Sequence, residues 1–234
     1  MTTNDHSPAP AARITWQDTP SGAIPVASRW DEAYYSRENG LAETRHVFLA
    51  GNDLPARFVP GFRLAELGFG TGLNLLAALL AWRASGTPGR LSFTSFESDP
   101  ISAPDMHRAL QAFPEALAAA GPLLDAWGSG RTRCETADLC AEIILGDARQ
   151  TLPGWPGRAD AWFLDGFSPA KNPELWADDL LLQVARHTAP NGTCATYTAA
   201  GSVRRGLQAA GFQVDRRPGH GRKRHMTAGR LTGA

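Results

Sequence analysis

The sequence predicts an α/β fold built around a mostly parallel, doubly wound sheet. From Arg63 onward, short apolar runs alternate with segments whose leucines recur at helical spacing, which is typical of a parallel sheet with helices on both faces. A glycine-rich turn follows the first apolar run, and three later runs end in a carboxylate. A chain of 234 residues with 43% hydrophobic residues is long enough to bury a core of this kind.

The N-terminal part of the chain does not share this alternation. Residues 1–12 combine proline, alanine and polar residues, and we expect a disordered tail there. ITWQDTPSGAIPVA has strand-type residues on both sides of a Thr-Pro-Ser-Gly turn, which predicts a hairpin. The aperiodic segment DEAYYSRENGLAETRHVFLAGN is expected to form helix and loop. We therefore predict an N-terminal extension at 13–62 that packs on a core at 63–234.

The core is expected to alternate strands and helices along its length. In its first helix, Leu73, Leu76 and Leu80 lie at helical spacing. The second helical run is expected to break near Pro114, and the third to begin at Pro173. In chain order, the expected elements are strand FRLAEL, helix GLNLLAALLAWRAS, strand RLSFTSFE, helix PDMHRALQAFPEALAAA, strands AEIILGDA and ADAWFLDG, helix PELWADDLLLQVARH, strand GTCATYTA, helix SVRRGLQAAG and strand FQVDRR.

Composition argues against several classes of protein. No apolar run approaches the roughly 20 residues that span a membrane. The start MTTNDHSPAPAAR lacks the hydrophobic region of a signal peptide, so we expect a cytoplasmic protein without a membrane partner. Cys134, Cys140 and Cys194 are odd in number and form no CxxC pair, which argues against a disulfide framework or a zinc site. The formal net charge is zero, but the chain after Gly201 is locally basic.

The glycine-rich turn lies in AELGFGTGLN, between the first strand and the first helix of the core. Gly68, Gly70 and Gly72 allow the backbone to approach a ligand closely and to adopt a positive φ. A dinucleotide fingerprint, GxGxxG, requires glycine at the position of Leu73. The spacing GxGxG after the acidic Glu66 instead resembles the first motif of S-adenosylmethionine-dependent methyltransferases. A purely structural tight turn is the alternative interpretation.

Carboxylates end the next strands: Glu97 closes the second, Asp147 the third and Asp165 the fourth. Because the carboxyl ends of parallel strands meet at one edge of a sheet, we expect these acids to converge there. Glu97 is placed to accept both ribose hydroxyls of a nucleoside cofactor, Asp147 to lie near its adenine edge, and Asp165 to face the reacting group. Each acid has the alternative role of a turn residue or helix cap.

With these residues in place, the chain resembles the methyltransferase domain of the bacterial MnmC- and MnmD-type enzymes, which make 5-methylaminomethyl-2-thiouridine at the tRNA wobble position. The resemblance runs from about Ile14 to Gly229. It is carried by ELGFGTGLN, DEAYYSRENGLAETRHVFLAGN, DAWFLDGFSPAKNPELW and GSVRRGLQAAGF with GHGRKR. It implies a Rossmann-like class I methyltransferase fold with an N-terminal hairpin cap. The implied reaction is methyl transfer from S-adenosyl-L-methionine to the primary amine of a 5-aminomethyl group on the wobble uridine.

The resemblance also implies the residues of the site, without a metal. The acid of the DGF motif, Asp165, carries over as the catalytic base. The predicted cofactor-binding residues are Glu66, Gly68, Phe69, Gly70, Gly72, Asn74, Glu97 and Asp147. The predicted tRNA-contacting residues are Tyr34, Phe167, Lys171, Arg204, Arg205, Arg222, Lys223 and Arg224. The alternatives are core packing for the aromatic residues, helix capping for Lys171 and a solvated face for the arginines.

Three departures from the family pattern matter. Ser98 follows the second-strand acid, where relatives commonly have lysine, and His225 stands where an acid is expected. The FAD-dependent oxidase domain of the bifunctional relatives has no counterpart after Gly201, so FAD is not expected in this chain. The aminomethyl group of the substrate would then come from a separate enzyme.

Methyl transfer sets a chemical requirement on Asp165. The attacking amine needs a free lone pair, and an aspartate with the reference pKa of about 3.9 is a poor base for an alkylammonium unless burial raises that pKa. We therefore expect Asp165 mainly to orient the amine and to stabilise the positive charge that develops on its nitrogen. Two other functions stay open at this point: a nicotinamide-dependent reductase and a non-catalytic tRNA-binding subunit.

Overall fold

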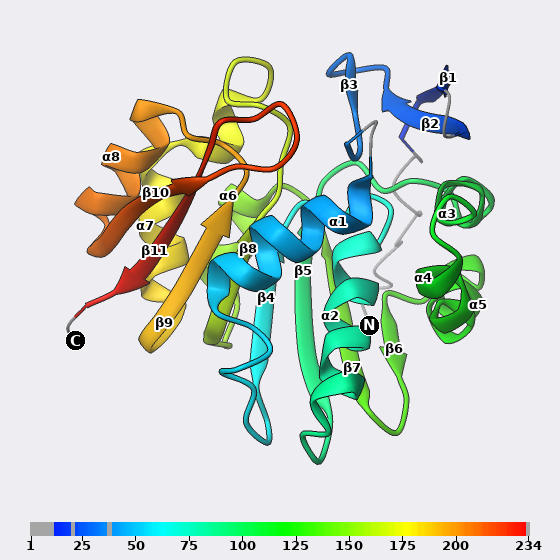
Figure 1. The fold of residues 1–234 in the computed structure, drawn as a ribbon, viewed down its shortest axis with the longest axis horizontal. Coiled ribbons are helices and arrows are strands. Elements are labelled where there is room, and N and C mark those ends of the chain that lie inside the picture. The colour runs from blue at the N-terminus through cyan, green and yellow to red at the C-terminus, as the bar shows by residue number, and fades with distance from the viewer. Residues whose placement is uncertain (1–11, 20–21, 37–38, 233–234) are drawn as a thin grey trace, which may run out of the picture.

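The computed structural model describes residues 12–19, 22–36 and 39–232, and an eight-stranded sheet forms its centre (Figure 1). The strands of this sheet are β4 (Arg63–Leu67), β5 (Leu91–Glu97), β6 (Arg133–Glu135), β7 (Leu139–Leu145), β8 (Ala159–Leu164), β9 (Thr188–Thr196), β10 (Phe212–Pro218) and β11 (His225–Leu231). They lie in the order β10-β11-β9-β8-β4-β5-β7-β6. The five strands from β9 to β7 in this order are parallel, whereas β6, β10 and β11 pair antiparallel with their neighbours. The mostly parallel α/β fold expected from the sequence is confirmed.

Helices cover both faces of the sheet because successive side chains of a buried strand point to opposite faces. Leu64 packs into one hydrophobic cluster, whereas Ala65 and Leu67 pack into the other. The first cluster includes α1 (Gly40–Thr44), α2 (Leu73–Ser85), α3 (Ala103–Leu110), α4 (Pro114–Ala119) and α5 (Gly121–Gly128). The second includes α6 (Ala148–Thr151), α7 (Asp178–Arg186) and α8 (Gly201–Ala209). Figure 1 shows α1 and α2 in front of the strands.

The chain reverses direction across the sheet between β4 and β8. From β4 it passes outward to β5 and β7, and then returns to β8 on the opposite side of β4. The two strands end side by side, and the backbone N–H of Asp165 donates to the carbonyl of Leu67 at 3.0 Å. Such a reversal opens a crevice at the carboxyl edge of a doubly wound sheet, where ligands bind.

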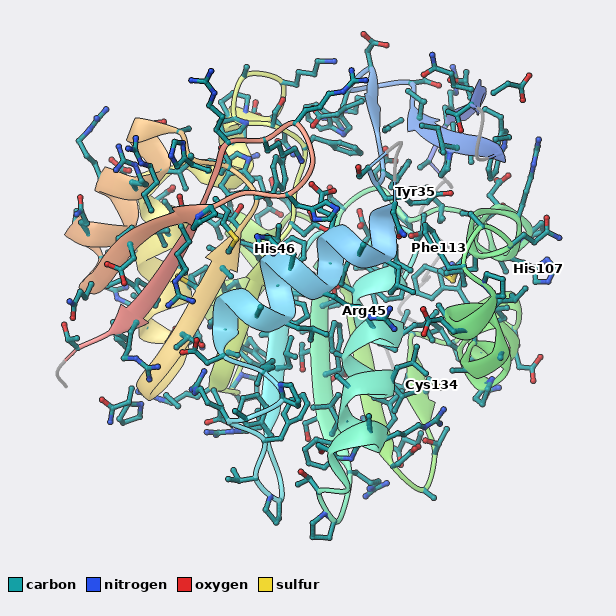
Figure 2. All side chains as sticks on the ribbon, in the orientation of Figure 1. Tyr35, Arg45, His46, His107, Phe113 and Cys134 are labelled. Carbon is teal, nitrogen blue, oxygen red and sulfur yellow. The ribbon has the colours of Figure 1, made fainter. Side chains whose placement is uncertain are left out.

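The N-terminal segment forms a small antiparallel sheet of β1 (Ile14–Thr19), β2 (Gly22–Ala27) and β3 (Glu32–Ala33). The expected hairpin is confirmed, and its turn residues 20–21 lie outside the described residues. Tyr35 fastens the segment to the core (Figure 2): its hydroxyl donates to the Ala109 carbonyl at 3.1 Å, and its ring meets that of Phe113 edge to face at 5.0 Å. The division into an extension at 13–62 and a core at 63–234 stays a prediction, and residues 1–11 of the expected tail are outside the described ranges.

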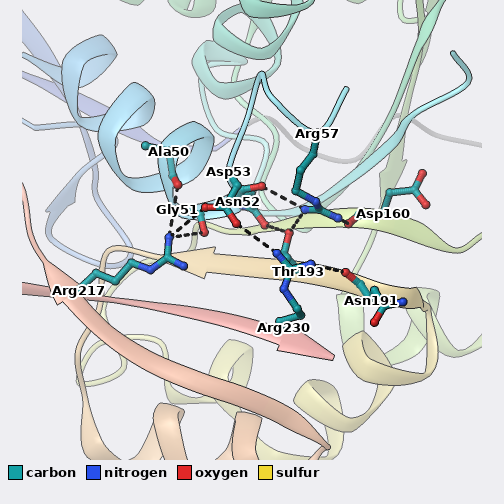
Figure 3. A network of polar contacts seen from close by, with 10 residues as sticks. All are labelled: Ala50, Gly51, Asn52, Asp53, Arg57, Asp160, Asn191, Thr193, Arg217 and Arg230. Carbon is teal, nitrogen blue, oxygen red and sulfur yellow. Dashed lines mark hydrogen bonds and ion pairs between the residues drawn. The ribbon is translucent and has the colours of Figure 1, made fainter. Parts of the chain in front are cut away.

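The helical segment from Gly40 to Asn52 forms an arm that precedes β4. A buried polar network fastens the end of this arm to the sheet (Figure 3). Beyond α1, the arm continues through a π-helical turn, η1 (Arg45–Leu49), and a 3-10 turn, η2 (Ala50–Asn52). The fully buried side-chain amide of Asn52 donates to the carbonyls of Phe48 at 2.9 Å and Trp162 at 3.1 Å. Its oxygen accepts from the Thr193 hydroxyl at 2.6 Å. These bonds hold η2 against β8 and β9.

Charged residues around Asn52 extend the network to other strands. Arg57 donates to the backbone carbonyl of Asp160 at 3.0 Å, and burial lowers the pKa of Arg57. Asp53 accepts from Arg230 of β11 at 3.2 Å and from Arg217 of β10 at 3.5 Å. The arm that precedes the core is thereby tied to the last two strands of the chain.

Several elements differ from the sequence-based expectation, among them two strands and the start of one helix. The pattern of GHGRKRHMTAGRL predicts no strand, because a basic run precedes small residues, yet β11 forms between β9 and β10. Those neighbours bury the stretch from Met226 to Ala228. The short strand β6 at the sheet edge was also not predicted. The helix expected from Pro173 begins at Asp178 instead, because Pro173–Trp176 form a separate 3-10 turn, η4.

We expect Asn52→Ala to lower the free energy of unfolding by about 2–4 kcal/mol, because it removes three buried hydrogen bonds to partners on η1, β8 and β9. Denaturation in urea measures this loss. Arg90→Ala serves as the control: it removes an ion pair of 3.4 Å between exposed side chains. Its expected cost is below about 1 kcal/mol. Equal losses in the two variants would contradict the structural role of Asn52.

Candidate active site

A cleft of about 1260 Å³ opens at the carboxyl edge of the sheet and includes the ends of β4 and β8. Pockets for one small ligand typically measure about 300–1,000 Å³, so this cleft has room for a cofactor and part of a second substrate. The predicted site residues that line it are Tyr34, Gly68, Phe69, Gly70, Asn74, Glu97, Asp147, Asp165, Phe167, Lys171, Arg222 and Lys223. The other predicted residues, all within the described ranges, lie outside its lining: Glu66, Gly72, Arg204, Arg205 and Arg224.

Close contacts shape the glycine loop between β4 and α2. Gly68 and Gly70 have φ values of +88° and +52°. A Cβ atom on Gly68 would lie 1.9 Å from the carbonyl oxygen of Asp165, and one on Gly70 would lie 3.1 Å from the Tyr34 ring. Only glycine at position 68 lets the ends of β4 and β8 stay this close. Part of the glycine requirement is therefore structural, as the alternative interpretation held.

Glu97, at the end of β5, holds the same loop from the other side. Its carboxylate accepts the backbone N–H of Gly70 at 3.0 Å and that of Asp99 at 2.7 Å. Burial raises the pKa of Glu97, and these two N–H groups oppose the rise. The carboxylate thus lies beside the glycine loop and lines the cleft with it.

Asp147, after β7, acts as a helix cap. Its carboxylate accepts the backbone N–H of Arg149 at 2.9 Å and forms an ion pair with the Arg149 side chain at 2.6 Å. The Arg149 guanidinium holds the pKa of Asp147 below its ordinary value. Both residues also line the cleft, so the capping role coexists with a position at its wall.

Asn74, in the first turn of α2, joins the buried acids of the site. Its side-chain amide donates to Glu66 Oε1 at 2.8 Å and to Asp165 Oδ2 at 2.6 Å. Its oxygen accepts from the Thr44 hydroxyl at 2.7 Å. Glu66 also accepts from the Ser95 hydroxyl at 2.7 Å, and burial raises its pKa well above the ordinary value. Both amide hydrogens are therefore used within the protein, and Asn74, which lines the cleft, connects Asp165 to Glu66, which does not.

Asp165 has the surroundings of an acid that titrates near neutral pH. Burial raises its pKa to about 7, and the hydrogen bond from Asn74 opposes part of that rise. Among the nearby charges, Glu43 and Glu32 raise this pKa and Lys223 lowers it. Burial was the condition under which Asp165 could serve as a base, and the structure meets that condition.

Aromatic rings form one wall of the cleft. The ring centroid of Phe167 lies 5.4 Å from that of Tyr34 and 6.0 Å from that of Trp30. The guanidinium of Arg29 lies 4.6 Å from the centroid of Trp30. Tyr34 and Phe167, both predicted from the sequence, are thus in contact. Trp30 joins them although its position in the sequence shows no pattern that separates it from a core residue.

Two acids of the N-terminal segment complete the site and were not predicted. Glu32 accepts the backbone N–H of Ser168 at 3.1 Å and its hydroxyl at 2.7 Å. Glu43 lines the cleft from α1. On the same side, Lys171 forms an ion pair of 3.5 Å with Asp31. Asp31, Glu32 and Glu43 all lie in the aperiodic segment from Asp31 to Asn52. Nothing in the sequence pattern there distinguishes them from solvated side chains.

The described part of the chain contains no group of three or more histidine, cysteine, aspartate or glutamate side chains placed to hold a metal ion. Cys134 and Cys194 are buried, Cys140 is partly buried, and all three are free thiols. Among the described helices, none combines the length and the apolar character needed to cross a bilayer.

Comparisons with known proteins identify relatives of the chain. A family model described as S-adenosyl-L-methionine-dependent methyltransferase matches residues 114–232. The chain is 46% identical over 227 residues to the tRNA 5-methylaminomethyl-2-thiouridine biosynthesis bifunctional protein MnmC of Caulobacter sp. (strain K31), covering 92% of this chain and 37% of that protein. The protein of the same name from Aeromonas hydrophila is 44% identical over 235 residues, covering 93% and 35%. The chain thus spans little more than a third of the length of these relatives.

Among solved structures, the crystal structure of MNMC2 from Aquifex aeolicus matches with a TM-score of 0.73 at 28% identity. The match covers 95% of this chain and 72% of that one. It confirms the Rossmann-like methyltransferase fold expected from the sequence.

The raised pKa of Asp165 predicts a pH-dependent stability. This group titrates at about 7 in the folded protein and near 3.9 in an unfolded chain, so the folded state binds more protons between these values. We expect the wild-type protein to lose stability relative to Asp165→Asn as the pH rises from about 4 to about 7. Urea unfolding of both proteins across this range measures the difference. A difference that does not change with pH would contradict the raised pKa.

Proposed function

The chain belongs to the family of S-adenosyl-L-methionine-dependent methyltransferases, and from this premise we propose that it methylates the primary amine of 5-aminomethyl-(2-thio)uridine at the tRNA wobble position. The product would be 5-methylaminomethyl-(2-thio)uridine. The observation that carries the proposal is Asp165, a partly buried carboxylate at the end of β8 whose pKa is raised to about 7. The substrate is supported by the relatives named for 5-methylaminomethyl-2-thiouridine biosynthesis.

S-adenosyl-L-methionine supplies an electrophilic methyl group when it is bound. The residues present fit this cofactor: Gly68 and Gly70 have the positive φ that allows a close backbone approach, and Phe69 lies between them in the lining. Glu97 would accept the ribose hydroxyls beside the loop, and Asp147 would lie toward the adenine. With this order, the reacting end of the cofactor would lie toward the end of β8.

Asp165 would orient the amine and take its proton. An alkylammonium resembles a lysine, with a pKa of about 10.4, and must lose a proton before nitrogen can attack. A carboxylate with a pKa of about 7 is a stronger base than the reference aspartate by about three units. Asn74 fixes the orientation of this carboxylate through the bond of 2.6 Å. The same negative charge stabilises the positive charge that develops on the attacking nitrogen.

The aromatic wall and the basic residues suit a single-stranded anticodon loop. Phe167, Tyr34 and Trp30 offer ring surfaces on which an unpaired base can stack. Phosphates would be bound by basic side chains at the cleft and farther along the surface: Lys171, Arg204, Arg205, Arg222, Lys223 and Arg224.

The proposed reaction needs a preformed primary amine, which we propose a separate enzyme supplies. A tRNA substrate would place the protein in the cytoplasm. The nicotinamide-dependent reductase that the sequence left open is not favoured by the family match. A non-catalytic tRNA-binding subunit is the remaining alternative, and a transfer assay separates it from the enzyme.

Methyl transfer from labelled S-adenosyl-L-methionine to two tRNA preparations tests this function. One preparation carries the 5-aminomethyl wobble uridine, and the other carries only the carboxymethylaminomethyl form, whose nitrogen is already alkylated. We expect label on the first alone. Label on neither, with the cofactor bound, would reject the substrate, and tRNA binding without any transfer would favour the non-catalytic subunit.

Asp165→Asn is expected to lower kcat at least about 100-fold with little change in tRNA affinity, because an amide cannot take the proton of the amine. In the wild-type protein, kcat/KM should rise with pH and level off above about 7, the pKa of this carboxyl. Asp138→Asn is the control, since Asp138 pairs with Arg83 away from the cleft lining. Nearly full turnover in Asp165→Asn would reject the role assigned to this acid.

A further inference from the structure

Lys223 reaches the cleft from the loop that joins β10 to β11. Its ammonium nitrogen lies 2.9 Å from Glu43 Oε1 and 3.8 Å from the centroid of the Tyr197 ring. The Tyr197 hydroxyl donates to the carbonyl of Gly166, the residue after Asp165, at 2.7 Å. The ammonium of Lys223 is therefore connected through the Tyr197 side chain to the backbone that follows Asp165.

The loop is held in this position by the same arm that carries Glu43. His46 Nε2 lies 2.9 Å from the Pro218 carbonyl oxygen, and the His46 and His220 rings are 5.7 Å apart. Figure 2 labels His46 on this arm. Within the loop, a Cβ atom on Gly219 would lie 2.1 Å from the Lys223 carbonyl oxygen, so the backbone there is folded tightly on itself. The position of Lys223 follows from these contacts and from its ion pair together.

The surroundings of the Lys223 ammonium have the chemistry of an amine-binding site. The Glu43 side chain is only 12% exposed, so its charge is shielded from most of the solvent. The face of an aromatic ring, here that of Tyr197, attracts a cation. Glu32, Glu43 and Asp165 line the same cleft as Tyr197, and burial together with their charges raises the pKa of the Tyr197 hydroxyl. Lys223 ends in a methylene group and a primary ammonium, as does the aminomethyl group of the proposed substrate.

We propose that Glu43 and Tyr197 bind the primary amine of the substrate, and that Lys223 occupies their site in the free protein until the substrate displaces it. The inference rests on the proposed function. A small amine without other contacts must compete with the tethered ammonium of Lys223. Its apparent affinity is therefore lower when Lys223 occupies the site in a larger fraction of the protein. An RNA brings phosphates as well, and these hold it at the cleft through other basic residues while its amine competes with Lys223.

The test compares two anticodon stem–loop RNAs that differ only in the wobble base, 5-aminomethyluridine or uridine. The ratio of their dissociation constants measures the contribution of the amine, because phosphate contacts are common to both RNAs and cancel. Lys223→Met keeps an apolar stem and removes the charge. We expect this variant to raise the preference for the aminomethyl RNA at least about fivefold. Glu43→Gln is expected to abolish most of that preference.

Arg224→Met is the matched control, because it removes a positive charge from the same loop at a residue outside the cleft lining. It should weaken both RNAs equally and leave the ratio unchanged. If Lys223→Met, or Lys223→Gln as a second uncharged variant, also leaves the ratio unchanged or lowers it, the inference is overturned. Methyl transfer by the wild-type protein is measured on the same RNAs. Absence of transfer rejects the proposed function, whereas transfer with an unchanged ratio rejects only the displacement of Lys223.

Discussion

The side-chain amide of Asn74 is the contact on which the arrangement of the site depends. It gives one hydrogen bond to Glu66, beneath the glycine loop, and one to Asp165, at the end of β8. Burial, together with the charge of Asp165, raises the pKa of Glu66, and the hydrogen bonds from Asn74 oppose the rise in both carboxyl groups. The Thr44 hydroxyl fixes the oxygen of the same amide at 2.7 Å. The α2 helix, two strands and the N-terminal arm thus meet at one polar group.

The N-terminal segment is therefore part of the site rather than a cover over it. Through Thr44 it orients Asn74, through Glu32 it holds the backbone after the DGF motif, and through Glu43 it adds a charge that raises the pKa of Asp165. The polar network around Asn52 fastens the same arm to β8 and β9. Because the arm is anchored at both ends, the acids that it carries are held at defined positions over the cleft.

The distribution of charge reconciles the proposed nucleic-acid substrate with a formal net charge of zero. Carboxylates are concentrated inside the cleft, where an amine would be bound and deprotonated. Basic residues lie at the cleft and on α8, where phosphates would be neutralised. Lys223 stands between the two regions, since its charge faces Glu43 in the free protein and lies on a loop rich in basic residues. An acidic centre within basic surroundings suits a reaction on an amine that is attached to RNA.

The sequence by itself determined the alternation of strands and helices, the glycine loop and the strand-end acids, because periodicity and turn chemistry are local properties. It did not determine β11, whose burial is supplied by β9 and β10. Only the tertiary structure decided the bond between Asn74 and Asp165, which are 91 residues apart, and the ion pair between Glu43 and Lys223, which are 180 apart. The raised pKa of Asp165 also depends on the tertiary structure. Burial and the charges of Glu43 and Glu32 raise this pKa, and both exist only once distant segments have packed together.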